Sequence, residues 1–171
     1  HVGTFDTRAV PDGPLSFDVA ATDTLNNTGH TTVTVTADNT PPTIADSSPN
    51  HSAWYSASPV VDATSSDANG LTSFTLAGLS GFVDNDGALA RVYGAWSIPA
   101  GQGDGPVAYS LTACDVVANC STSPQSLNVD RTAPAVALSP SPATLTKASS
   151  VNLTITATDA SSGVAHVYAQ N

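Results

Sequence analysis

Residues 104–115 of this chain read DGPVAYSLTACD, and residues 12–23 read DGPLSFDVAATD. The two stretches share an opening Asp-Gly-Pro, an aromatic residue three places after the proline, and a closing aspartate. The correspondence continues without gaps as far as Asp38 in the first copy and Asp130 in the second. A match of this length indicates an internal repeat with a spacing of 92 residues.

The composition favours an all-β chain. All 14 acidic residues are aspartates, and only four lysines and arginines oppose them, so the net charge is −10. Glutamate, lysine, methionine and arginine, which are good helix formers, are scarce or absent. Threonine, valine, serine, glycine and proline are abundant and favour strands and turns. Hydrophobic residues make up 40% of the chain, which suffices for a core, so we expect a folded protein.

The charge and the motifs argue against several classes of function. Nucleic-acid binding draws on clustered lysines and arginines, and attraction to an anionic membrane surface needs the same positive charge. No apolar run approaches the roughly 20 residues that span a bilayer. The chain contains neither a phosphate-binding glycine loop nor a G-x-S-x-G nucleophile motif. We therefore expect no nucleic-acid partner, no membrane insertion and no catalytic activity.

One unit of the repeat spans residues 39–130. Runs of strand-forming residues, bounded by Pro, Gly, Asn and Asp, predict seven short strands in it. The expected strands are 43–47, 59–65, 71–77, 88–93, 95–98, 106–114 and 120–129. Seven short strands in such a length are typical of a Greek-key β-sandwich of the immunoglobulin type. Tyr109 then takes the place of a tyrosine-corner residue early in the sixth strand, whereas Phe17 stands there in the first copy and has no hydroxyl.

The two ends of the chain correspond to parts of further units. Residues 1–38 match the C-terminal half of an Ig-like unit, and residues 131–171 match the N-terminal half. Each half alone would expose an apolar sheet. Either the chain is a segment of a long tandem array within one polypeptide, or successive chains complete one another's split unit by strand complementation. A head-to-tail contact of the second kind propagates as a fibre.

The shared motifs also carry a family resemblance. The pattern DGPxx[FY], followed by AxDxxxN and by VTVxxDNTPPT, resembles the bacterial immunoglobulin-like repeats of large surface adhesins and extracellular fibres. The resemblance covers the whole chain and implies tandem immunoglobulin-like sandwiches with a structural role outside the cell. The chain departs from the pattern at Cys114 and Cys120 and in the long stretch 79–93, LSGFVDNDGALARVY.

Cys114 and Cys120 flank the predicted hairpin between the last two strands, where the first copy has Thr22 and Thr28. Residues directly opposed in such a hairpin have Cα atoms roughly 4.5–5.5 Å apart, which is within the disulfide range. A zinc site would need about four ligands, and the sequence offers no second pair of cysteines or histidines. We therefore predict a hairpin disulfide, which implies an oxidising, extracellular setting.

Aspartates are the candidate metal ligands. In an immunoglobulin-like sandwich, the loops after the second and sixth strands lie at the same end. Those loops carry Asp67 and Asp115, and the incoming linker brings Asp38. Three carboxylates with nearby amide and backbone oxygens can supply the six to eight oxygens that Ca²⁺ takes. The equivalent set at the next joint is Asp130, Asp159 and Asp23, the last from another half-unit. The alternative is that these aspartates serve only as turn residues.

Other candidate sites are weaker. Four N-glycosylation sequons are present, at Asn26, Asn50, Asn119 and Asn152. Trp54 and Trp96 can either stack on sugars or pack in the core or its rim. The four histidines are scattered without metal-ligand spacing, which favours surface positions.

From the sequence we expect a structural repeat segment of a secreted bacterial surface protein or fibre, which gives reach and stiffness. Its neighbours are further Ig-like units or subunits arranged head to tail, and a protein or glycan can be its receptor. One alternative is a self-assembling filament subunit in which half-units of neighbouring chains complete each other. Another is a carbohydrate-binding accessory module of a secreted hydrolase.

Overall fold

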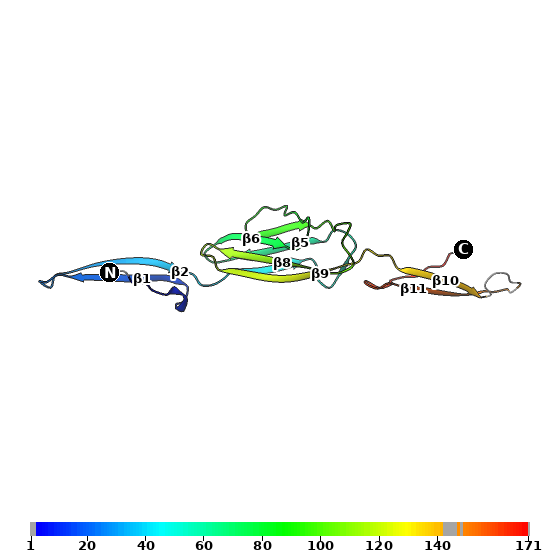
Figure 1. Cartoon of the computed structure of the whole chain (residues 1–171), viewed down its shortest axis with the longest axis horizontal. Coiled ribbons are helices and arrows are strands. Elements are labelled where there is room, and N and C mark those ends of the chain that lie inside the picture. Colours follow the sequence, from blue (N-terminus) through cyan, green and yellow to red (C-terminus); the bar gives the residue numbers. More distant parts are fainter. Residues whose placement is uncertain (1–2, 142–146, 148, 171) are drawn as a thin grey trace.

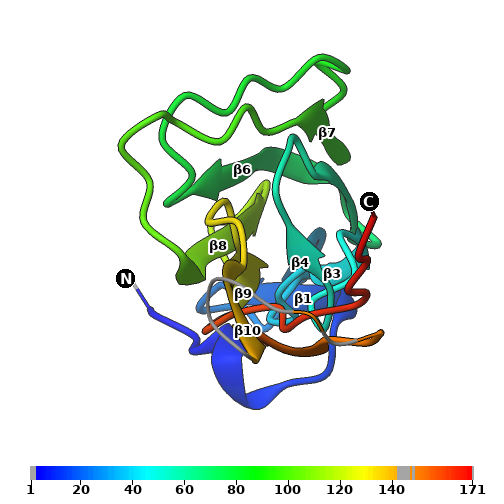
Figure 2. The same cartoon turned by 90° about the vertical axis from the view of Figure 1, so that its right-hand side faces the viewer.

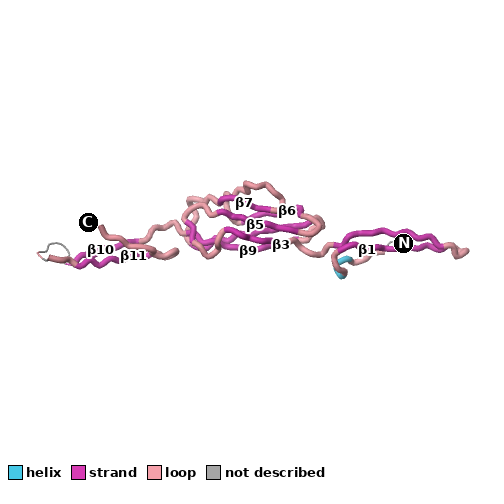
Figure 3. The backbone as a smooth tube through the Cα atoms, turned by 180° about the vertical axis from the view of Figure 1, so that it is seen from behind, coloured by secondary structure: helices cyan, strands magenta, loops and turns pink. Residues whose placement is uncertain are grey.

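The computed structural model describes residues 3–141, 147 and 149–170 and shows an extended molecule made of a hairpin, a sandwich and a second hairpin (Figure 1). The N-terminal hairpin consists of β1 (Gly13–Thr22) and β2 (Thr28–Ala37) and follows a short 3₁₀ turn, Thr7–Ala9. The C-terminal hairpin consists of β10 (Ala135–Ser141) and β11 (Asn152–Thr158). Seen from behind, the two hairpins lie beyond opposite ends of the sandwich (Figure 3).

The sandwich has two sheets. One is β3–β5–β7 and the other is β4–β9–β8–β6, and all pairs are antiparallel except β4 with β9. The strands are β3 (Thr43–Ser48), β4 (Trp54–Tyr55), β5 (Val60–Ser66), β6 (Leu71–Ala77), β7 (Arg91–Ala95), β8 (Gly105–Asp115) and β9 (Cys120–Val129). β6, β8 and β9 share one sheet. The chain crosses between the sheets after β3, because β3 pairs with β5 in one sheet and the next strand, β4, pairs with β9 in the other. This order confirms the expected immunoglobulin-like Greek key.

Two expectations about strands were wrong. The stretch 95–98 was expected to be a strand, but only Ala95 is in one, as the last residue of β7. The sandwich instead contains the two-residue β4, which is too short to show a pattern in the sequence. Trp96 in that stretch is a core residue that is 1% exposed, and its indole Nε1 donates a hydrogen bond to the carbonyl of Ser80 at 2.9 Å. The strand expected at 88–93 begins later and forms β7.

The core lies between the two sheets of the sandwich. Alternate residues of β8 point inward, so Tyr109, Leu111 and Ala113 are buried, and Leu127 and Val129 of β9 join them. The tyrosine-corner role expected for Tyr109 is wrong. Its hydroxyl donates a 2.7 Å hydrogen bond to the buried Asp46 carboxylate on β3, and not to nearby backbone.

Both hairpins repeat the geometry of sandwich strands. β1 pairs with β2 in the register of β8 with β9, so that Thr22–Thr28 corresponds to Cys114–Cys120. β10 pairs with β11 in the register of β3 with β5, so that Ala135–Thr158 corresponds to Thr43–Ser66. Viewed along the long axis, both hairpins project onto the side of the sandwich that holds β9, away from β7 (Figure 2). The unit boundaries at residues 39 and 130 remain predictions.

Candidate functional site at the first joint

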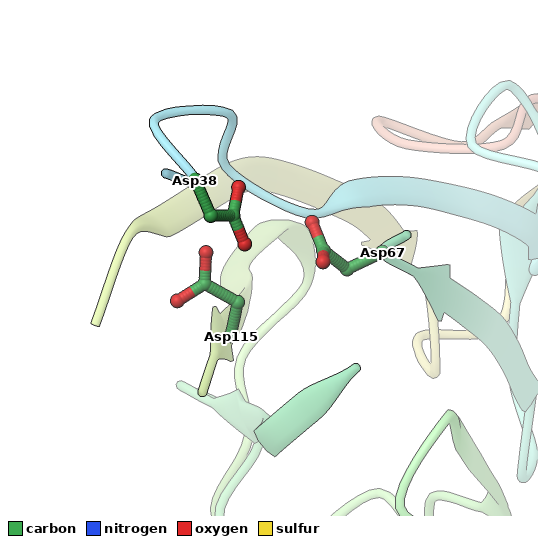
Figure 4. Close-up of side chains that lie close together, drawn as sticks. All are labelled: Asp38, Asp67 and Asp115. Carbon is green, nitrogen blue, oxygen red and sulfur yellow. The ribbon is translucent and has the colours of Figure 1, made fainter. Parts of the chain in front are cut away.

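Three aspartates from separate segments meet where the N-terminal hairpin joins the sandwich. Asp38 lies in the linker after β2, Asp67 follows β5, and Asp115 ends β8. Their carboxylates point toward a common space (Figure 4). Each offers one oxygen, and these oxygens all lie within 4.8 Å of one another. The structure thus brings together the three aspartates that the sequence assigned to one end of the sandwich, while calcium binding itself stays a prediction.

Asp115 is the most deeply buried member, at 1% exposure. Its Oδ1 accepts hydrogen bonds from the backbone N–H groups of Val117 (2.8 Å) and Asn119 (2.9 Å), and its Oδ2 accepts one from Asn119 Nδ2 (2.7 Å). Burial by itself raises the pKa of Asp115, but the hydrogen bonds from Asn119, Val117 and Ala118 outweigh it and hold the pKa below its usual range. Asp115 is therefore a carboxylate at neutral pH.

Asp38 carries an unsatisfied oxygen. Its Oδ1 accepts a hydrogen bond from the backbone N–H of Thr40 at 3.3 Å, but its Oδ2 is buried and has no hydrogen-bond partner within the described residues. No lysine or arginine of the described part forms an ion pair with Asp38, Asp67 or Asp115. A buried carboxylate oxygen without a donor is costly, so an electropositive group here would be stabilising.

The linker of this joint, residues 38–42, is held by the sandwich. Asn119 Nδ2 donates to the carbonyl of Asp38 at 3.1 Å, and Ser121 Oγ donates to the carbonyl of Pro42 at 2.6 Å. Asn119 therefore connects the linker to Asp115, whose oxygen accepts from the same amide group. Pro42 itself is fully buried. These contacts fix the linker against the end of β8 and β9.

The residues before β1 hold the same linker from the other side. Asp12 accepts hydrogen bonds from the backbone N–H of Asn39 at 2.6 Å and from the Thr40 hydroxyl. Asn39 Nδ2 donates to the carbonyls of Thr7 (2.9 Å) and Val10 (3.1 Å). The joint is thus bonded on both sides, which limits rotation about the linker.

The second joint, residues 130–134, repeats this plan. Asp104, the counterpart of Asp12, accepts a 2.8 Å hydrogen bond from the backbone N–H of Arg131, and Arg131 Nη1 donates to the carbonyl of Pro99 at 2.8 Å. Each joint also borders an open pocket. Eight residues around the first pocket have their sequence counterparts, 92 positions later, around the second pocket. These are Asp12, Thr40, Pro41, Thr43, Ser66, Asp67, Ala68 and Asn69, matched by Asp104, Thr132, Ala133, Ala135, Thr158, Asp159, Ala160 and Ser161.

The three aspartates predicted for the second joint do not lie together in one molecule. At the second joint, Asp130 is 7% exposed, and its Oδ2 accepts a 3.0 Å hydrogen bond from the backbone N–H of Ser162. Asp159 lies at the same joint and accepts from the backbone N–H groups of Ser161 (3.1 Å) and Gly163 (2.8 Å). Asp23 instead lies at the exposed tip of the N-terminal hairpin, at the far end of the molecule (Figure 1).

Asp23 nevertheless has the local geometry of Asp115. Its Oδ1 accepts from the backbone N–H groups of Leu25 (2.8 Å) and Asn27 (2.9 Å), and its Oδ2 accepts from Asn27 Nδ2 (2.8 Å). The side-chain bond from Asn27, with the backbone bonds, lowers the pKa of Asp23. The hairpin tip is therefore preformed even without a neighbouring linker.

The predicted hairpin disulfide is present. Cys114 and Cys120 are bonded and their Cα atoms are 4.2 Å apart. At the corresponding position of the N-terminal hairpin, the hydroxyls of Thr22 and Thr28 are hydrogen-bonded at 2.9 Å. The β8–β9 hairpin and the N-terminal hairpin thus have different cross-strand links at the corresponding position.

The remaining predicted sites lie in different environments. Asn26, Asn50 and Asn152 are exposed, whereas Nδ2 of Asn119, the atom to which a glycan is attached, donates to both Asp115 and Asp38. Trp54 is 40% exposed, and the burial of Trp96 leaves only Trp54 for stacking on a sugar. His1 lies outside the described residues, while the other three histidines are exposed or half-buried.

Sequence reasoning missed Asp12 and Asp46. Asp12 belongs to the Asp-Gly-Pro opening that both copies share, and that recurrence was a signal for a role in the joint. Asp46 sits in the core beside Tyr109, and its side chain is 4% exposed. Asp46 lies in the strand expected at 43–47, but the local sequence gives no sign that its side chain is buried against Tyr109.

The fold is that of an immunoglobulin-like β-sandwich with a two-stranded hairpin beyond each end (Figure 1). Residues 1–86, half of the chain, match the family model of the bacterial Ig-like domain (group 3), so the chain belongs to that family. The match runs from β1 through β6 and includes the first joint. Domains of this family are typically non-catalytic and often extracellular.

A comparison with curated proteins finds no match. The described part of the chain holds no helix that is long and apolar enough to cross a membrane.

Proposed function

We propose that this chain is a structural, non-catalytic segment of a secreted bacterial surface protein or extracellular fibre, and that it sets the reach and stiffness of that protein. The observation that carries the proposal is the first joint, where one linker is hydrogen-bonded to the sandwich on one side and to the Asp12 region on the other. A flexible connection between independent modules would leave such a linker free.

The composition of both linkers supports the same role. Pro41 and Pro42 in the first joint and Pro134 in the second restrict the backbone, and proline-rich linkers act as semi-rigid spacers. The disulfide between Cys114 and Cys120 supports an extracellular location, because disulfides persist in oxidising compartments.

Calcium at the first joint is part of the proposal. Ca²⁺ takes six to eight oxygen ligands in flexible geometry, and Asp38, Asp67 and Asp115 present carboxylate oxygens to one space. The buried Oδ2 of Asp38 has no other partner among the described residues, and a cation would supply one. Because the three aspartates come from the linker, the turn after β5 and the end of β8, a shared ion would lock the linker to the sandwich.

The test is calcium-dependent melting. We expect Ca²⁺ to raise the Tm of the sandwich, with a Kd on the order of 10⁻⁴–10⁻³ M as in other extracellular modules. Asp67→Asn should abolish the rise because it removes one of the three charged ligands. Asp18→Asn is the matched control, since Asp18 lies on the exposed polar face of β1. This variant should show the same calcium-induced rise in Tm as the parent. Equal melting with calcium and with chelator would rule out this ion.

Stiffness is tested separately by small-angle X-ray scattering of the chain with and without calcium. An extended, narrow distribution of distances agrees with the proposed role. A broad distribution under both conditions would contradict the stiff-spacer function, whatever the melting data show.

A further inference from the structure

The N-terminal hairpin has one polar face and one apolar face. On the polar face, Ser16 is hydrogen-bonded to Thr34, and Asp18 to His30. The apolar face carries Leu15, Phe17, Val19, Val33 and Val35. Val19 is 57% exposed, Val33 54% and Val35 43%. Phe17 is half-buried, and its ring packs edge-on against Phe5 of the same chain with 5.3 Å between centroids, so the described chain covers only part of this face.

The sandwich shows what such a face packs against. Phe17, Val19 and Val35 correspond in sequence and register to Tyr109, Leu111 and Leu127, which are 0–3% exposed. In the sandwich, the opposite sheet with β3 and β5 covers these residues. Within the described residues, the N-terminal hairpin therefore has no partner that corresponds to β3 and β5.

The C-terminal hairpin is of that kind. It has the register of β3 and β5, and its own apolar face is exposed. Val136 is 66% exposed, Leu138 58%, Leu153 52% and Ile155 39%. The two hairpins thus correspond to the two halves of one sandwich, and the inner face of each is largely exposed.

One pair of positions shows that these two faces match each other. Inside the sandwich, the Tyr109 hydroxyl donates to the Asp46 carboxylate. The counterpart of Tyr109 is Phe17, and the counterpart of Asp46 is Leu138. Both polar partners have been replaced together by apolar residues. If Phe17 packed against a strand with an aspartate at the position of Asp46, the buried carboxylate would have no hydrogen-bond donor. If Phe17 packs against Leu138, no buried polar group is left without a partner.

The segment after β11 corresponds in sequence to a further sandwich strand. In the sandwich, β6 pairs with the edge of β8 that β9 leaves free. Residues 163–169 are the counterpart of β6, and the structure describes them without strand pairing. Among the described residues, β1 pairs only with β2, so its other edge is open. By the register of β6 with β8, Val167 would lie opposite Ala20.

We infer that the inner face of the N-terminal hairpin binds the C-terminal hairpin of a second copy of this chain, with residues 163–169 adding a strand to the edge of β1. The two hairpins lie beyond opposite ends of one molecule, so these two surfaces meet only between copies (Figure 1). The contact brings Asp23 of one copy to Asp130 and Asp159 of the next, as at the first joint. It joins two different surfaces head to tail, which produces an open chain of copies.

The first test is the mass of the 171-residue chain against concentration. We expect association, and we expect Val19→Asp to weaken it at least tenfold by placing a charge in the contact. Thr36→Asp adds the same charge to the polar face of β2 and should leave association unchanged. The Tm of the sandwich shows that each variant is folded. A monomer with an intact sandwich at all concentrations would overturn the inference and leave the proposed spacer function standing.

The second test uses the matched pair. Leu138→Asp alone should weaken association tenfold or more, because it faces Phe17. Phe17→Tyr added to Leu138→Asp should restore most of the affinity by recreating the hydrogen-bonded pair of the sandwich. Independent effects of the two substitutions would show that these residues do not meet.

The third test fixes the register. Cysteines at positions 20 and 167, made by Ala20→Cys and Val167→Cys, should link different copies into a disulfide-bonded ladder under mild oxidation. Ser16→Cys with Val167→Cys places the thiols four residues out of register and should give no ladder. Equal linking of both pairs would contradict the strand addition.

Discussion

At the scale of single residues, the least expected feature is a polar pair inside an apolar core. Tyr109 and Asp46 are both almost fully buried and share a 2.7 Å hydrogen bond. His51 Nε2 lies 3.4 Å from the same Asp46 oxygen, and His51 Nδ1 is 2.8 Å from the carbonyl of Ser126. Burial and the neighbouring Asp46 carboxylate both raise the pKa of Tyr109, so the hydroxyl keeps its proton and remains a donor.

This pair predicts an unusual pattern of stability. Tyr109→Phe should lower the free energy of unfolding by about 1–3 kcal/mol, because the Asp46 carboxylate loses its donor. Asp46→Leu combined with Tyr109→Phe should recover most of that loss, since replacing both partners by apolar groups leaves no unsatisfied charge. Urea denaturation of the two variants and the parent chain measures this. A double variant that is less stable than Tyr109→Phe would contradict the argument.

Asp115 predicts a dependence on acid. The folded protein holds the pKa of Asp115 below its usual value, so the carboxylate contributes stability above the unfolded pKa of about 3.9. That contribution is lost as the pH falls through the lower folded pKa. Asp115→Asn should therefore have a lower Tm than the parent at pH 7 and a shallower decline in Tm between about pH 4 and pH 2. The measurement is the Tm of both proteins in chelator across this pH range. If Tm falls with pH equally in the variant and the parent, Asp115 makes no such contribution.

At the scale of elements, the hairpin between β8 and β9 is the clearest case in which sequence and structure agree. The sequence placed both cysteines opposite each other, and they are bonded. The same hairpin also positions Asp115 and Asn119, so one element provides a covalent link, a buried carboxylate and a contact with the linker. The N-terminal hairpin repeats the carboxylate geometry without the disulfide.

The disulfide should be stabilising but dispensable. The loop it closes is short, and the chain-entropy estimate for about seven residues is roughly 2 kcal/mol. We expect Cys114→Thr with Cys120→Thr to fold and to lose no more than about that amount, because Thr22 and Thr28 already form a hydrogen bond at the matching position. Denaturation of this variant beside the oxidised parent provides the measurement. Failure of the double threonine variant to fold would show that the bond is essential.

At the scale of the whole molecule, shape follows from the joints. The hairpins and the sandwich extend along one line (Figure 1), and Asp12 and Asp104 hold the residues that follow Asp38 and Asp130. These two aspartates belong to the repeated Asp-Gly-Pro motif. The motif therefore has a role beyond starting a strand, since it ties the end of the hairpin to the next linker.

Loosening the first joint should change shape without unfolding the sandwich. Asp12→Ala removes the acceptor for Asn39 and Thr40, so the N-terminal hairpin should sample more orientations. Small-angle scattering should show a broader distribution of distances, while the Tm of the sandwich stays the same. Asp18→Ala is the control, because Asp18 is exposed and its hydrogen bonds to His30 and Thr32 lie within the hairpin, away from the joint. An unchanged scattering profile for Asp12→Ala would mean that other contacts hold the joint.

The sequence alone determined the features that local patterns and the repeat encode. Alternation and turn residues placed six of the seven sandwich strands. The position of the cysteines across a predicted hairpin identified the disulfide, and the shared end of the second and sixth predicted strands brought together the three aspartates of the first joint. Only the tertiary structure revealed β4, the buried position of Trp96 and the pair of Asp46 with Tyr109. These depend on contacts between residues far apart in the chain: Tyr109 meets Asp46 only because the two sheets stack, and β4 exists only because β9 offers an edge.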